Sequence, residues 1–340
     1  MRIAVLAPIA WRTPPRAYGP WEQVAFHHAE GLVRRGHDVT LFATADSVTS
    51  ARLEAVAPRP YEEDRSLDPK VWECLHIAHL MEQSERFDLI HNHYDFLPLT
   101  FSRLIRTPMV TTIHGFSSEA IVEVYRCYDS VVGYISISTA NRHPDLTYVA
   151  TVYNGVDPGQ FTFRSAPGSY LLFMGRIHHD KGAREAIEIA RRAGLPLLIA
   201  GIVQDEPYFR RYVEPAIDDR SIRYLGPVDP QRRDELLGGA LALLHPINFD
   251  EPFGLTVVES MLAGTPVIAV RRGSMSELIQ DGETGFLVDD VAGAVEAVQA
   301  LRADPGHIDR SRCRRRAEEH FSVDAMVDGY LEAYEAVLPR

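Results

Sequence analysis

Two glutamates flank a short glycine-containing turn in the second half of the chain. Glu251 begins the segment Glu251-Pro252-Phe253-Gly254, and Glu259 falls within the helix predicted over Leu255–Leu262. The amides that open this helix, after the permissive Gly254, favour a negative charge, whereas carboxylates accept hydrogen bonds from hydroxyls. The layout predicts a ligand with a phosphate between hydroxyl-rich rings, as in a nucleotide-sugar. The alternative is a capped surface helix whose glutamates are solvated.

A second loop, Gly175 to Gly182, offers the positive charge that a diphosphate attracts. It contains Arg176 and Lys181, a planar fork and a compact ammonium that together suit two phosphates. Two of the 35 basic residues are lysines, so Lys181 stands out in a chain that otherwise uses arginine. A surface loop with solvated charges is the alternative. The sequence contains no Asp-x-Asp pair, which predicts a reaction without a metal or another cofactor.

An aromatic, basic loop follows the first predicted strand and ends at a predicted helix. We expect Trp11, Tyr18 and Trp21 to stack on an acceptor substrate, and the alternative is a proline-rich connector pinned by its aromatic residues. Pro20 suits the first position of the helix, and Gly19 suits a strained entry to it.

Histidines end two further predicted strands. A zinc site at His91-x-His93 needs a third ligand, and none is evident nearby, so we predict packing with one ligand contact in this segment rather than a metal site. Asp95 follows in the same segment and is expected to contact the acceptor. His114 ends the strand predicted over Met109–His114, where it can face a ligand. A histidine satisfied by backbone groups is the alternative.

The composition is that of a soluble globular protein. Apolar residues make up 46% and charged residues 24% of the 340 residues, a length that allows two domains. The net charge of −12 argues against nucleic-acid binding, and no apolar run reaches the length of a membrane span. Cys74, Cys127 and Cys313 lack metal-ligand spacing, which favours a reducing cytoplasm.

Apolar runs alternate with helical patterns along the whole chain, which predicts two doubly wound, Rossmann-like α/β domains with parallel sheets. Ligands of such sheets bind beyond the carboxyl ends of the strands, so we expect the two domains to face a cleft that holds the site. We place the domains at residues 1–160 and 161–321. The predicted strands are Arg2–Leu6, Asp38–Ala43, Asp88–His91, Met109–His114, Val131–Ile135, Tyr148–Tyr153, Tyr170–Met174, Leu197–Ala200, Ile222–Leu225, Leu241–His245, Val267–Val270 and Phe286–Val288.

Taken together, these motifs resemble glycosyltransferase family 4, a group of retaining, metal-independent enzymes with the GT-B fold. The resemblance covers nearly the whole chain in the expected order. The matching segments are Tyr18-Gly19 with Glu22, Gly36-His37-Asp38-Val39, His114-Gly115, Asn154-Gly155-Val156-Asp157, Gly175-Arg176 with Lys181-Gly182, Gly226 after Tyr224, Glu251-Pro252-Phe253-Gly254 with Glu259, Gly264-Thr265-Pro266-Val267 and Gly282-Glu283-Thr284-Gly285-Phe286.

The resemblance implies a role for each matching residue. Arg176 and Lys181 would bind the donor diphosphate together with amides near Gly254 and Leu255. Glu251 would hold hydroxyls of the donor sugar, Glu259 the nucleotide ribose, and His114 the donor sugar or its phosphate. Donor contacts are also implied for Gly19, Gly175, Gly226 and Phe253.

The resemblance also implies that a last helix, about residues 322–340, packs back on the first domain. One departure stands out, because Pro20 replaces the second glycine that the family commonly has, and proline has no amide hydrogen to offer a ligand.

The expected activity is transfer of a hexose from a UDP- or GDP-linked sugar to a hydroxyl of a small soluble acceptor. Inverting enzymes of this architecture typically use a histidine base in the loop after the first strand, and the loop from Trp11 to Trp21 has no histidine, aspartate or glutamate, which favours retention. A hydrolysing nucleotide-sugar 2-epimerase and a non-catalytic sugar-nucleotide-binding protein are the alternatives.

Overall fold

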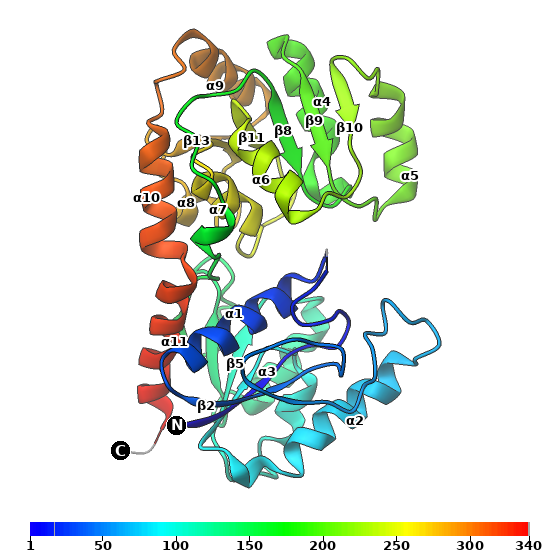
Figure 1. Cartoon of the computed structure of the whole chain (residues 1–340), viewed down its shortest axis with the longest axis vertical. Helices are drawn as coiled ribbons and strands as arrows, with labels where there is room; N and C mark the ends of the chain where they lie inside the picture. The colour runs from blue at the N-terminus through cyan, green and yellow to red at the C-terminus, as the bar shows by residue number, and fades with distance from the viewer. Residues whose placement is uncertain (17, 339–340) are drawn as a thin grey trace. The chain divides into compact units, whose positions relative to one another are not determined.

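The chain divides into two compact units in a computed structural model that describes residues 1–16 and 18–338 (Figure 1). Unit 1 comprises Met1–Gly155 and Val323–Arg340, and unit 2 comprises Val156–Ser322. The predicted boundaries were at residues 160 and 321. The predicted cleft concerns the placement of the two units relative to one another, and it stays a prediction.

Unit 1 is built on a seven-stranded sheet in the order β3-β2-β1-β4-β5-β6-β7, and every neighbouring pair is parallel. The strands are β1 (Arg2–Leu6), β2 (Asp38–Phe42), β3 (Arg52–Glu54), β4 (Leu89–Asn92), β5 (Met109–Ile113), β6 (Gly133–Ser136) and β7 (Tyr148–Thr151). The edge strand β3 was not predicted, because three residues without a buried side chain give no apolar run.

Helices pack on both faces of this sheet, because alternate residues of each strand point to opposite faces. Ile3 and Val5 of β1 belong to one core and Ala4 and Leu6 to the other. The helices of unit 1 are α1 (Pro20–Arg34), α2 (Pro69–Met81), α3 (Val122–Tyr128) and α11 (Val323–Val337).

The last helix, α11, packs on α1 within unit 1 (Figure 1). Their contact is close at Gly31, where a β-carbon would stand 2.4 Å from Cγ2 of Val327. The two helices share a core that includes Val24, Leu32 and Met326. The end of the chain therefore completes the core that lies on one face of the first sheet.

Unit 2 holds a six-stranded sheet in the order β10-β9-β8-β11-β12-β13, again with parallel neighbours. The strands are β8 (Leu171–Met174), β9 (Leu197–Ala200), β10 (Ile222–Tyr224), β11 (Ala242–His245), β12 (Val267–Val270) and β13 (Gly285–Val288). The helices are α4 (Ala183–Ala193), α5 (Glu206–Tyr208), α6 (Pro230–Gly238), α7 (Leu255–Leu262), α8 (Met275–Leu278), α9 (Val291–Ala303) and α10 (Arg310–Phe321). Two parallel α/β sheets confirm the predicted fold class.

Each sheet has one point at which the strand order reverses. In unit 1 this point lies between β1 and β4, and in unit 2 it lies between β8 and β11. Loops that leave two such strands diverge at the carboxyl edge of the sheet and leave a crevice between them. The aromatic loop and the segment around Asp95 follow β1 and β4, and the loops with Lys181 and Glu251 follow β8 and β11.

No helix among residues 1–16 and 18–338 is both long enough and apolar enough to cross a membrane.

Candidate functional site

The loops that follow β8 and β11 touch through their backbones. Gly182 has a left-handed φ of 77°, and a β-carbon there would stand 1.9 Å from the carbonyl oxygen of Pro246. The amide of Asn248 also donates to the carbonyl of Asp180 across 2.7 Å. The two loops can therefore meet only if position 182 is glycine.

This contact brings Lys181 and Glu251 together. The Lys181 ammonium donates to the Glu251 carboxylate, and it also lies 4.6 Å from the ring centroid of Phe249. Both partners are largely buried, with 15% and 12% of their side chains exposed. The sequence predicted that both face a ligand, but it did not predict that they pair with each other.

Glu251 is ionised throughout the neutral range. Burial acts to raise its pKa, but the approach of His245 and the charge of Lys181 outweigh burial and lower the pKa to about 2. His245 Nε2 lies 3.6 Å from Glu251 Oε2, beyond hydrogen-bond length, and has no hydrogen-bond partner among the described residues. His245 ends β11, and as the last residue of an apolar run it carried no separate signal.

The turn before α7 has the geometry of an anion site. Gly254 precedes the helix with a φ of 101°, and a β-carbon there would stand 2.9 Å from Cε of Met275. Phe253 is buried, and its carbonyl accepts a 2.5 Å hydrogen bond from Ser274 Oγ. The amides of Leu255 and of Thr256, next in the chain, donate to no residue in the described part of the chain. Free amides at a helix N-terminus attract an anionic group.

Glu259 is paired with Arg233 rather than solvated. Arg233 Nη1 donates to Glu259 Oε1 across 3.0 Å, and the guanidinium stands 5.3 Å from the ring centroid of Phe161. Burial raises the pKa of Glu259, and the charge of Arg233 partly offsets this. The pair excludes a capped surface helix with a solvated glutamate at this position. Sequence reasoning missed Arg233, because nothing local distinguishes it among 33 arginines (35 basic residues minus two lysines).

Three of the remaining residues predicted to contact the donor, Gly175, Arg176 and Gly226, lie in loops of unit 2. Arg176 donates to Gln204, and the Gly175 amide donates to the Ala200 carbonyl across 3.0 Å. The carbonyl of Gly226, after β10, accepts from the Gly201 amide across 2.9 Å. Their predicted ligand contacts stay predictions.

In unit 1, Glu22 organises the aromatic loop. Its Oε1 accepts a 3.0 Å hydrogen bond from the Trp11 amide, and burial raises its pKa to about 7. Trp11 and Tyr18 meet edge to face at 5.9 Å between ring centroids. Gly19 is the residue before α1, and Trp21 is the second residue of that helix.

Two of the predicted contact residues beyond β4 and β5 are largely buried. Asp95 accepts a 2.8 Å hydrogen bond from Tyr125 Oη, yet burial outweighs this bond and raises its pKa to about 6. His114 stacks on Trp21 with ring centroids 5.3 Å apart, and its Nε2 lies 3.0 Å from His93 Nδ1. Its partner is therefore a side chain, and not the backbone group that the alternative required.

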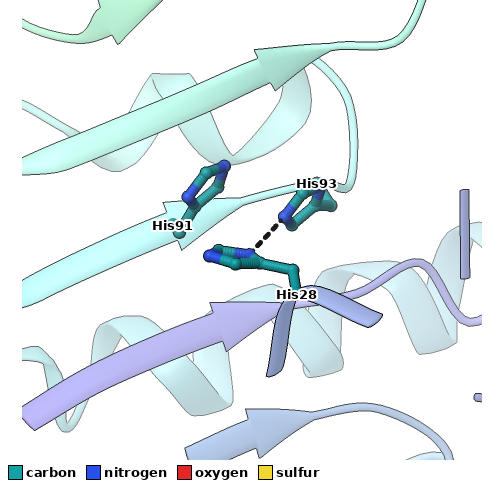
Figure 2. Close-up of side chains that lie close together, drawn as sticks. All are labelled: His28, His91 and His93. Atoms are coloured by element: carbon teal, nitrogen blue, oxygen red, sulfur yellow. Dashed lines mark hydrogen bonds between the residues drawn. The ribbon is translucent and has the colours of Figure 1, made fainter. Parts of the chain in front are cut away.

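A third imidazole lies beside His91 and His93, so the prediction that no third ligand is nearby was wrong. It belongs to His28 of α1, which is distant in sequence but packs against the end of β4 (Figure 2). The ligand nitrogens of the three residues lie within 4.8 Å of one another. Sequence spacing gave no sign of this, because the packing of α1 on the sheet creates the cluster.

The geometry of these three histidines nevertheless favours hydrogen bonds over a metal ion. The rings of His91 and His93 stack with an interplanar angle of 2° at 4.3 Å, so their in-plane lone pairs run parallel rather than converge. His28 Nδ1 and His93 Nε2 lie 2.9 Å apart and share a hydrogen bond (Figure 2). Every ring nitrogen of the three residues has a hydrogen-bond partner. A second group, His178, His179 and Asp205, lies in unit 2, and the side chain of His179 is exposed.

Two family models match almost the whole chain. "Glycosyltransferase Family 4" matches residues 21–160, and "Glycosyl transferases group 1" matches residues 163–320. The chain is 26% identical to a glycogen synthase of Mycobacterium tuberculosis over 96% of this chain and 94% of that protein. It is 27% identical to a D-inositol 3-phosphate glycosyltransferase of Pseudarthrobacter chlorophenolicus over 92% of this chain and 89% of that protein.

Solved structures share the fold. AviGT4, a glycosyltransferase involved in avilamycin A biosynthesis, superimposes with a TM-score of 0.72 and 23% identity over 98% of this chain and 97% of its own. Anabaena HepE, solved in complex with UDP and glucose, gives a TM-score of 0.75 and 18% identity over 99% and 100% of the two chains. Together with the family models, these matches identify the fold as GT-B. The chain belongs to the family 4 glycosyltransferases.

Proposed function

We propose that this glycosyltransferase moves a hexose from a UDP- or GDP-linked sugar to a hydroxyl of a small acceptor, with retention at the sugar carbon and without a metal ion. The observation that carries the proposal is the Lys181–Glu251 pair, which joins the loop after β8 to the loop that leads into α7. It combines a fixed cation and an ionised carboxylate beside an anion site. HepE, which shares the fold, was solved with UDP and glucose, and this supports a nucleotide-sugar donor.

The donor groups match the charges in unit 2. The diphosphate would accept from the amides of Leu255 and Thr256 and from Lys181, which keeps two further N–H groups beyond the one given to Glu251. Glu251, with its pKa lowered to about 2, remains an acceptor for sugar hydroxyls. Glu259 would accept from the ribose hydroxyls in place of its bond from Arg233.

The proposed reaction breaks two bonds and forms two. The bond between the sugar carbon and the diphosphate oxygen breaks, and the acceptor oxygen bonds to the same carbon on the face that the diphosphate leaves. The acceptor proton passes to a diphosphate oxygen. Negative charge grows on the diphosphate, and Lys181, Arg176 and the α7 amides would stabilise it. Electrostatic stabilisation of this kind is usually the largest single contribution to catalysis.

The acceptor side is proposed for unit 1. Trp11, Tyr18 and Trp21 offer aromatic faces around the entry to α1, and Asp95 offers a carboxylate beyond β4. A small hydroxylated molecule suits such a surface, since a ring can stack while a hydroxyl reaches the carboxylate. The relative named for D-inositol 3-phosphate suggests the first small acceptor to try, and the relative named for glycogen suggests a polymeric acceptor for comparison.

Acceptor-dependent release of nucleoside diphosphate tests the proposal. The full chain is incubated with UDP-glucose or GDP-mannose, with and without D-inositol 3-phosphate, glucose or glycogen, in buffer containing EDTA. Transfer predicts release only with an acceptor and no loss of rate in EDTA. Equal release without any acceptor would favour a hydrolysing 2-epimerase, and binding without release would favour a non-catalytic protein.

A further inference from the structure

Seven side chains of unit 1 form one continuous buried line of hydrogen bonds, which we call the histidine relay. It begins at the end of β5, passes through the end of β4 and α1, and ends on α11 (Figure 2 shows its centre). Its six links join His114 Nε2 to His93 Nδ1 (3.0 Å), His93 Nε2 to His28 Nδ1 (2.9 Å), His28 Nε2 to Tyr334 Oη (2.8 Å), Tyr334 Oη to His91 Nδ1 (2.6 Å), His91 Nε2 to Thr112 Oγ1 (2.7 Å) and Thr112 Oγ1 to Tyr330 Oη (3.2 Å).

Every imidazole in the relay is neutral. Burial lowers the pKa of His28 and His114 to about 3 and that of His91 and His93 well below the ordinary value. A neutral imidazole carries one N–H, so a ring with both nitrogens engaged must donate on one side and accept on the other. The direction of one link therefore fixes the direction of the next.

The link between Thr112 and Tyr330, at the end of the relay on α11, sets the direction of its hydrogen bonds. Thr112 Oγ1 donates to Tyr330 Oη, so its lone pair must accept from His91 Nε2–H. His91 Nδ1 then accepts from Tyr334, and Tyr334 accepts from His28 Nε2–H. By the same rule, His93 Nε2–H donates to His28 Nδ1, and His114 Nε2–H donates to His93 Nδ1.

At the near end, this direction leaves His114 Nδ1 without a hydrogen. That atom bonds to none of the residues that the structure describes, and it is not among the buried polar atoms that lack a partner, so it keeps some exposure. The Trp21 ring stacked on His114 holds the plane of the imidazole. A bare nitrogen accepts from a hydroxyl but cannot donate to a phosphate oxygen.

We propose that the histidine relay locks His114 in the Nε2–H form, so that its Nδ1 accepts a hydrogen bond from a substrate hydroxyl and cannot donate to a phosphate oxygen. His93, His28 and Tyr334 are then positioning residues, since they act on the ligand only through His114. This inference rests on the proposed function, and on the contact with the donor sugar or its phosphate that the family resemblance implies for His114.

Nitrogen NMR of the full chain, labelled with 15N-histidine, reads the tautomers directly without any ligand. His76 is an internal standard, because its Nε2 bonds to the Ala7 carbonyl, which only accepts, across 2.9 Å. The relay predicts that His114, His93, His28 and His91 all show the His76 pattern, with the hydrogen on Nε2. A hydrogen on Nδ1 of His114 would overturn the inference.

Two distant substitutions test the coupling. Thr112→Val or Tyr334→Phe would leave a buried N–H donor without an acceptor, and reversal of the relay avoids that cost, so His114 should change to the Nδ1–H form in both variants. Tyr134→Phe is the matched control, because Tyr134 is a buried tyrosine of unit 1 that donates to the Tyr125 carbonyl outside the relay. An unchanged His114 in a folded Thr112→Val or Tyr334→Phe protein would contradict the coupling.

Ligand addition separates this inference from the proposed function. UDP-glucose should shift the His114 Nδ1 resonance, and UDP alone should not. In Thr112→Val the KM for the nucleotide-sugar should rise roughly fivefold to tenfold, the loss of about one hydrogen bond, with the Kd for UDP unchanged. If His114 has its hydrogen on Nε2 but UDP-glucose does not shift its Nδ1 resonance, the hydroxyl contact alone is refuted. If UDP-glucose shifts that resonance but no sugar is transferred to an acceptor, the proposed function alone is refuted.

Discussion

Lys181 and Glu251 form an ion pair between the loops that follow two neighbouring parallel strands. The pair depends on a glycine that allows the loops to touch, and it lies beside a helix with free amides. Cation, carboxylate and amides are thus held by rigid elements of one sheet before any substrate arrives. Preorganised charges of this kind stabilise a leaving group without further rearrangement.

Loss of either cation in the Gly175–Gly182 loop should slow transfer strongly. Removal of one such stabilising donor typically lowers kcat by about 100-fold to 1,000-fold. We expect Lys181→Ala and Arg176→Ala to fall in this range, measured as kcat/KM with UDP-glucose. Lys70→Ala is the control, since Lys70 is the other lysine and is exposed on α2. Near-normal rates in both loop variants would refute their role.

Glu259 should contribute mainly to nucleotide binding, and Glu251 mainly to turnover. Glu259→Gln should weaken UDP binding roughly tenfold or more, because a charged hydrogen bond to the ribose is worth about 1.5–3 kcal/mol. Glu251→Gln should mainly lower turnover, since its predicted contacts are to the sugar. Calorimetric titration with UDP and steady-state kinetics check this. Equal effects of the two substitutions on UDP affinity would contradict these separate roles.

The stability of unit 1 should fall with rising pH because of Glu22. Its pKa is about 7 in the fold against an ordinary 4.5, so the folded state holds its proton more tightly. The stabilisation is complete below pH 4.5 and is lost as pH rises through 7, amounting to roughly 3 kcal/mol. Glu22→Gln should remove this slope in denaturant titrations. A slope equal to that of the wild type between pH 4.5 and 7 would contradict a buried, proton-retaining Glu22.

Gly182→Ala should disrupt the contact between the loops that follow β8 and β11. The added β-carbon would collide with the Pro246 carbonyl, so either the loop moves or the fold is strained. We expect a large loss of activity and a stability loss of at least about 1 kcal/mol by thermal unfolding. Gly306→Ala is the control, since its β-carbon would meet only Asp304 Oδ1 at 3.4 Å. Full activity in Gly182→Ala would show that the loop contact is dispensable.

The sheets were predictable because parallel strands buried on both faces appear as continuous apolar runs. The edge strand β3 escaped detection because it has no such run. The turn at Gly254 and the loop from Gly175 to Gly182 were predictable because the residues that define each of them lie close together in the sequence. The contacts were not predictable. His28 meets His93 across 65 positions of sequence, and Arg233 meets Glu259 across 26, so these pairs follow from packing alone.

The anomeric configuration of the product tests the central claim most directly. With UDP-glucose, whose sugar is α-linked, and an acceptor found by diphosphate release, proton NMR of the fresh product reports the new linkage. Same-face attack, with a diphosphate oxygen as the base, predicts an α-linked product. A β-linked product would contradict retention, and it would require a general base that the loop from Trp11 to Trp21 does not contain.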